Sequence, residues 1–129
     1  MDDEPRRVGG QATVEFALCL TVFLMIVFGT VDFGRAIFLK SELDNAVREG
    51  ARYGKLNPTS TSGVTSRVVS FASDTGLTTS GVTVSCAGVC LTGDKMTVTA
   101  SVQFSAFTQS LLGISPFTVG TDYVVVDIE

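Results

Sequence analysis

The sequence predicts an α+β protein in which one long N-terminal helix carries a small head built on an antiparallel sheet. Three observations support this fold class. Residues 12–31 form a continuous apolar run, residues 32–55 continue a helical pattern with charges of both signs, and residues 96–104 alternate between apolar and polar side chains. We therefore divide the 129-residue chain into a leader over 1–10, a helix over 11–57 and a head over 58–129.

The apolar run has the length of a membrane span. Its 20 residues would extend about 30 Å as a helix, which equals the hydrocarbon thickness of a bilayer. Glu15 is the only charged residue between Arg7 and Asp32, and a charge at the bilayer centre costs about 2.5–3.5 kcal/mol. The run is longer than a secretory signal core, and Gly34-Arg35-Ala36 is a poor signal cleavage site. The sequence thus favours a retained anchor in contact with membrane lipid.

The helix is expected to begin near Gln11, because Pro5 and the Gly9-Gly10 pair discourage helix, and to continue past the membrane to about Lys55. One apolar stripe recurs at spacings of 4, 3, 4 and 3 along its second half: Leu39, Leu43, Ala46, Gly50 and Tyr53. We expect the stripe to pack partly on the chain's own head, with the remainder facing other subunits, since so long a helix exceeds what the head can cover.

Charged residues on the second half have ordinary explanations. Asp32 and Arg35 are three residues apart and can pair at the membrane boundary, and the cluster of Arg48, Glu49 and Arg52 is typical of a solvated helix face. Gly54, Asn57 and Pro58 supply the helix stop.

The head is expected to contain one short helix and a small sheet. The helix is predicted over 64–76 after a linker over 59–63, and residues 105–113 are predicted as a helical turn or a loop. Strands are predicted over 82–84, 96–104, 117–119 and 123–128. Cys86 and Cys90 are predicted to close a short disulfide loop, which indicates an oxidising compartment and places the head outside the cytoplasm.

Composition argues against several function classes. The chain has no His, and no Ser-x-x-Lys or Gly-x-Ser-x-Gly motif occurs, so we do not expect an enzyme or a cofactor. A two-cysteine set does not complete a zinc site, and no basic patch of the size that nucleic acid requires is present. A single-pass binding module with a ligand-recognising head remains the alternative to a structural protein.

Three segments of the long helix carry a resemblance to a known family. They are Gly-Gln-Ala-Thr-Val-Glu-Phe-Ala-Leu at 10–18, Val-Asp-Phe-Gly-Arg-Ala at 31–36 and Asn-Ala-Val-Arg-Glu-Gly-Ala-Arg-Tyr at 45–53. Together they resemble the TadE-like family, the minor pseudopilins of tight-adherence (Tad) pili within the type IV prepilin superfamily. The resemblance covers roughly residues 10–53, and the head matches only loosely.

The resemblance implies a processed and assembled subunit of the inner membrane with its N-terminus in the cytoplasm. A prepilin peptidase would cleave between Gly10 and Gln11, and Glu15, followed by Phe16, would pair with the new N-terminal amine of a neighbouring subunit. Gly29 and Gly34 would allow close helix approach in the bundle. The implied partners are other pilin or pseudopilin subunits and the Tad assembly platform, and the implied roles are pilus biogenesis, secretion and cell adhesion.

Overall fold

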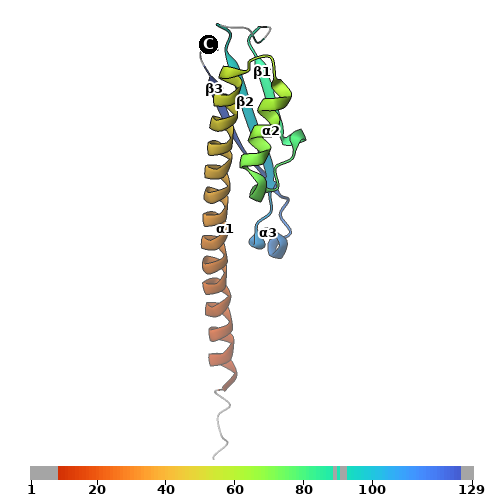
Figure 1. The fold of residues 1–129 in the computed structure, drawn as a ribbon. Helices are drawn as coiled ribbons and strands as arrows, with labels where there is room; N and C mark the ends of the chain where they lie inside the picture. The colour runs from red at the N-terminus through yellow and green to blue at the C-terminus, as the bar shows by residue number, and fades with distance from the viewer. Residues whose placement is uncertain (1–8, 89, 91–92, 126–129) are drawn as a thin grey trace, which may run out of the picture.

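The computed structural model describes residues 9–88, 90 and 93–125, and its dominant element is one helix of 48 residues, α1 (Gly9–Leu56) (Figure 1). The helix begins earlier than the sequence predicts, because it includes the glycine pair. Helix extension is cooperative, so two weak residues at one end do not outweigh the long helical run that follows them. Residues 1–8 of the predicted leader over 1–10 lie outside the described residues.

The head consists of short elements that follow α1. Their bounds are α2 (Thr61–Phe71), the 3-10 turns η1 (Ser73–Thr75) and η2 (Thr79–Gly81), β1 (Val82–Cys86), β2 (Met96–Phe104), α3 (Phe107–Leu112) and β3 (Phe117–Val125). The predicted helix over 64–76 is thus shifted toward the N-terminus. The regular helix ends at Phe71, and Gly76 leaves the following 3-10 turn in the left-handed conformation, with φ of 75°.

The sheet has three strands in the order β1-β2-β3, and both pairings are antiparallel. The prediction of two separate C-terminal strands is wrong for the described part, because β3 is continuous through residues 120–122. Each of its residues has a partner on the nine-residue β2, and Gly120 lies opposite Ser101. Residues 126–128 of the last predicted strand lie outside the described residues.

The core lies between the sheet and the second half of α1. Helices α1 and α2 cover the same face of the sheet, so the head has two layers (Figure 1). The fully buried side chains with the largest volumes come from α1, α2 and alternate positions of β2: Leu43, Val47, Val64, Val68, Met96 and Val98. The Thr121 hydroxyl of β3 donates to the carboxylate of Asp44 on α1.

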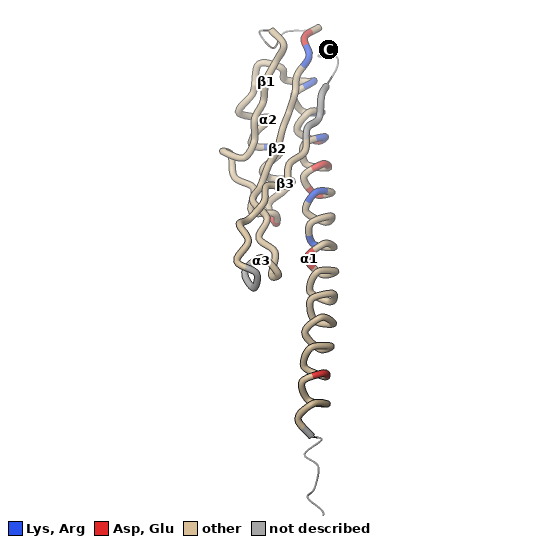
Figure 2. The backbone as a smooth tube through the Cα atoms, turned by 180° about the vertical axis from the view of Figure 1, so that it is seen from behind, with Lys and Arg blue, Asp and Glu red and all other residues tan. Residues whose placement is uncertain are grey.

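The first half of α1 projects beyond the head. In the view from behind, α3 is the part of the head nearest to this projecting half, and the N-terminal end of the helix stands alone (Figure 2). Any functional site that depends on this half must therefore be completed by something outside the folded head.

Candidate functional site

The projecting half of α1 is an apolar surface that no other described part of the chain covers. Every residue from Gly10 to Phe28 is exposed, including Phe16 at 66% and Phe23 at 60%. Within the described residues, α1 is the one helix long and apolar enough to cross a membrane, with a mean hydropathy of 2.3 in its best window. Exposed apolar surface of this extent marks an interaction with lipid or protein. It fits a single-pass membrane anchor.

Polar side chains on the projecting half find acceptors or donors one turn away. The hydroxyls of Thr21 and Thr30 each donate to the backbone carbonyl four residues earlier, at 2.8 Å. The side-chain amide of Gln11 donates to Oε1 of Glu15 at 3.2 Å. A carboxylate accepts several hydrogen bonds, so Glu15 has capacity to bind a further donor. Glu15 and Phe16, the predicted assembly residues, therefore lie on an accessible helix end close to Gly10 and Gln11 of the predicted cleavage site.

The two glycines expected to pack against other helices lie in open space. Apart from the chain neighbours and the adjacent backbone of α1 itself, no atom of the described residues comes within 4 Å of a Cβ placed at Gly29 or Gly34. Gly50 differs, because a Cβ there would overlap Cγ2 of Val68 on α2. The head also buries Leu43 and Ala46 fully and packs against Leu39 and Tyr53. The head therefore covers the stripe from Leu39 to Tyr53 and leaves Gly29 and Gly34 accessible.

Asp32 joins the long helix to the tip of the head. Its carboxylate accepts hydrogen bonds from the backbone N–H of Phe107 at 3.0 Å and of Thr108 at 2.9 Å, and from the Thr108 hydroxyl at 2.8 Å. These N–H groups belong to the first turn of α3, so Asp32 acts as the cap of a helix 75 residues away. The residue itself is 6% exposed.

The sequence predicted only the pairing of Asp32 with Arg35, and that pair is present at 3.5 Å. The capping role was missed. Its one signal in the sequence is Ala106, the residue before α3, whose side chain has no acceptor for the first-turn N–H groups.

Arg35 extends this junction to two aromatic rings. Its guanidinium carbon lies 4.8 Å from the ring centroid of Phe107 and 5.4 Å from that of Phe104. Phe104 in turn packs on Phe117, with 5.2 Å between ring centroids. Such cation–π contacts stabilise by about 0.5–1 kcal/mol at exposed sites. Asp32 and Arg35 thus fix where α3 stands along α1.

The cluster of Arg48, Glu49 and Arg52, predicted as a solvated helix face, is only partly exposed to solvent. Arg52 is well exposed, and its guanidinium donates to Glu49 at 2.8 Å. Glu49 is largely covered and also accepts a hydrogen bond from Arg67 of α2 at 3.1 Å. Hydrogen bonds from Arg52 and Arg67 lower the pKa of Glu49 to about 2. The cluster therefore links α2 to α1 in addition to facing solvent.

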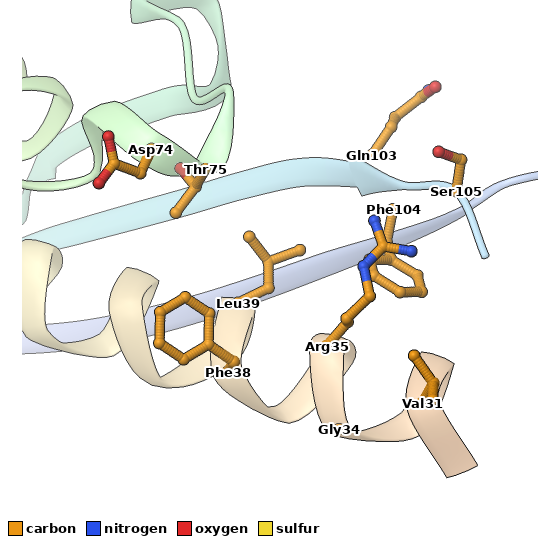
Figure 3. A pocket seen from close by; sticks show the side chains of 10 residues that line it. All are labelled: Val31, Gly34, Arg35, Phe38, Leu39, Asp74, Thr75, Gln103, Phe104 and Ser105. Carbon is orange, nitrogen blue, oxygen red and sulfur yellow. The ribbon is translucent and has the colours of Figure 1, made fainter. Parts of the chain in front are cut away.

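A groove of about 580 Å³ runs between α1 and the lower end of the head (Figure 3). Its floor on α1 includes Gly34 and Leu39. Figure 3 shows Arg35 and Phe104 toward one end of the groove and Asp74 toward the other. The lining mixes apolar and polar groups. Among the described residues, no group of three or more potential metal ligands occurs.

The structure joins Cys86 and Cys90 in a disulfide, with 5.4 Å between their Cα atoms. The bridge closes the connection that leaves β1, at the end of the head farthest from α3. Cys19 is a free cysteine on the projecting half of α1. The disulfide is therefore remote from both the exposed helix and the Asp32 junction.

A long helix with an apolar first half, carrying a three-stranded antiparallel sheet on its second half, is a pilin-like arrangement. The class defined by the fold and the exposed helix is thus that of pilin-like proteins. The family model of TadE-like protein matches residues 10–52, which confirms the resemblance seen in the sequence. The match lies entirely within α1 and spans one third of the chain.

The match to the TadE-like family is a match to pilus-associated, pilin-like proteins of a structural kind. It also implies contact with other pilus components. No curated protein and no solved structure matches the chain.

Proposed function

We propose that this chain is a minor pilin-like subunit of a Tad/type IVb pilus, cleaved by a prepilin peptidase after Gly10 and assembled through the projecting half of α1. The observation that carries the proposal is the uncovered apolar helix with a single charge near its start, within the segment that matches the TadE-like family. Before assembly the helix would span the inner membrane, with its N-terminus in the cytoplasm and the head outside.

Glu15 supplies a physical reason for coupling cleavage to assembly. A carboxylate in lipid is costly unless it is paired. The amine released at Gln11 of a neighbouring subunit exists only after cleavage, and Glu15 has acceptor capacity beyond its bond with Gln11 of its own chain. Cleavage would thus produce the cation that makes helix packing favourable, and Gly29 and Gly34 would let the helix backbones approach closely.

Processing is tested by the N-terminus of membrane-derived protein. We expect mass spectrometry to find Gln11 as the first residue in cells with an active prepilin peptidase. Gly10→Val should block the cleavage, whereas the same change at the neighbouring Gly9 should allow it. An intact Met1 on the wild-type chain in such cells would refute the proposal.

The charge pairing is tested by comparing Glu15→Ala with Gln11→Ala. Both variants remove the hydrogen bond between the two side chains, but only Glu15→Ala removes the carboxylate. We expect both to be cleaved normally and only Glu15→Ala to be depleted from sheared pilus fractions. If the two variants assemble equally well, the carboxylate has a local role only, and the pairing mechanism is wrong.

A membrane-anchored binding module is the alternative function, and the groove beside Leu39 is its best candidate site. The groove is open and its floor includes Gly34, which belongs to the uncovered side of α1. This location favours the packing of another helix over the enclosure of a small ligand, so we retain the pilin-like assignment.

A further inference from the structure

We propose that the tip of the head, formed by α3 and the turn that follows it, rests in the membrane interface that faces the head, with Phe107 and Ile114 inserted among the lipids. The inference depends on the proposed anchoring of α1 in a bilayer and goes beyond it, because it gives the folded head a membrane contact of its own.

The depth of the tip follows from Asp32. The apolar run ends at Val31, and Asp32 is the first charged residue after Glu15. Because the Asp32 carboxylate binds the N–H groups of Phe107 and Thr108 within 3.0 Å, the start of α3 lies at the level where the apolar run ends. In Figure 1, α3 is also the part of the head nearest to the projecting half of α1. A span over residues 12–31 therefore places α3 at the bilayer surface.

The chemistry of the tip suits that position. Phe107 is 64% exposed and Ile114 is 58% exposed, and residues 105–117 contain no charged side chain. Phe33, on the first turn of α1 beyond the span, is exposed as well. The half-exposed Arg35 over the Phe107 ring supplies a cation at the level of lipid phosphates. Exposed Phe and aliphatic side chains beside a basic residue are typical of segments that lie in a membrane interface.

Several polar groups of the tip are hydrogen-bonded within the tip itself. Gln109 accepts from the N–H of Ala106 at 2.8 Å and donates to the carbonyl of Ser115 at 3.2 Å. The N–H of Ile114 bonds to the carbonyl of Gln109, which Gly113 permits by adopting a φ of 68°. Polar backbone left unpaired is costly in an apolar surrounding. These hydrogen bonds therefore lower the cost of placing this turn in the interface.

The test uses the absence of Trp from the sequence. The full chain is reconstituted at a high lipid-to-protein ratio in phosphatidylcholine vesicles, with and without bromine on the acyl chains, and Trp emission is compared. Phe107→Trp is the reporter. Phe23→Trp, within the span, reports whether α1 is inserted. Phe71→Trp is the matched control, because its ring also lies under an arginine, Arg67, at 5.1 Å.

Phe71 is far from the expected membrane. Val64 lies at Gly54 and Val68 at Gly50, so α2 runs back along α1 and Phe71 lies about one turn nearer to Asp32 than Val68 does. Gly50 follows Asp32 by about 27 Å along the helix axis, which leaves Phe71 about 20 Å beyond the level of Asp32. We expect brominated lipid to quench Phe107→Trp nearly as strongly as Phe23→Trp and to leave Phe71→Trp unquenched. Ile114→Trp, which does not alter the ring beneath Arg35, should be quenched like Phe107→Trp.

Each other outcome overturns a defined statement. If Phe23→Trp is quenched while Phe107→Trp and Ile114→Trp remain unquenched like Phe71→Trp, the tip contact is refuted and the anchoring of α1 stands. An unquenched Phe23→Trp refutes the anchoring of α1 and the tip contact together. If Trp emission at the tip is not quenched by bromine but changes with the chain-to-lipid ratio, the tip contacts a second copy of the chain, and contact with lipid is refuted.

Discussion

Gly50 is the position where one added methyl group should have opposite effects on an isolated α1 and on α1 packed against the head. Alanine is a better helix former than glycine by about 1 kcal/mol, so Gly50→Ala would stabilise an isolated helix. In the folded head, however, the new Cβ would overlap Cγ2 of Val68 and lie 3.5 Å from the carbonyl oxygen of Val64. Val68 is fully buried, and its branched side chain is stiff. Overpacking of this kind costs about 1–3 kcal/mol, so after the gain in helix propensity we expect a net loss of up to about 2 kcal/mol.

The assay is thermal unfolding of the detergent-solubilised full chain, followed by near-ultraviolet circular dichroism of its aromatic side chains. Each kcal/mol should lower Tm by about 4–8 °C for a head of this size. Gly34→Ala is the matched control, since it is the same substitution in the same helix with no atom within 4 Å of the new Cβ. We expect its Tm to equal or exceed that of the wild type.

A double substitution tests the cause of the loss. Val68→Ala removes the atoms that the new methyl group overlaps, so Gly50→Ala and Val68→Ala together should cost less than the sum of their separate effects, by about 1 kcal/mol. The reasoning is refuted if Gly50→Ala is as stable as Gly34→Ala, or if the two costs simply add.

Three further predictions follow from the same contacts. Asp32→Ala should accelerate hydrogen exchange at the Thr108 amide while α1 stays helical. Asp32→Asn, which keeps one acceptor oxygen, should have a smaller effect. Equal exchange at this amide in the wild type and both variants would contradict the capping role. Because the folded pKa of Glu49 is depressed to about 2, its stabilising contribution is complete above about pH 5 and is lost as the pH falls toward 2. The Tm of Glu49→Gln should therefore depend less steeply on pH in acid than the Tm of the wild type, and Arg67→Ala should have part of this effect. Identical profiles of Tm against pH in the three chains would refute the linkage. Gly34→Leu should leave Tm unchanged and deplete the subunit from sheared pili; normal incorporation would remove this glycine from the packing surface.

Local signals were sufficient for the long helix and for the central strand. The apolar run, the stripe from Leu39 to Tyr53 and the alternation from Met96 to Phe104 are periodic patterns, and each depends only on neighbours in the sequence. The structure places α1 at Gly9–Leu56 and β2 at Met96–Phe104, close to or at the predicted bounds. Element ends that depend on the context of a few residues, such as the start of α2 at Thr61, were less well predicted.

Long-range pairings could not be predicted in the same way. Asp32 and Arg35 looked like a local pair because they are three residues apart, whereas the main partners of Asp32 are 75 and 76 residues away. The continuity of β3 also depended on a partner, since β2 supplies a hydrogen-bonding residue opposite each position from Phe117 to Val125. Neither contact leaves a periodic trace in the sequence.

By itself, the sequence determined that this protein has a long apolar helix with one charge near its start and a sheet-containing head, because hydropathy and periodicity are properties of adjacent residues. Only the tertiary structure decided which helix positions the head uses and which it leaves open. Gly34 and Gly50 are the same residue type in the same helix, yet one faces open space and the other faces Val68. The difference arises from how α2 folds back onto α1, and no local property of either glycine records it.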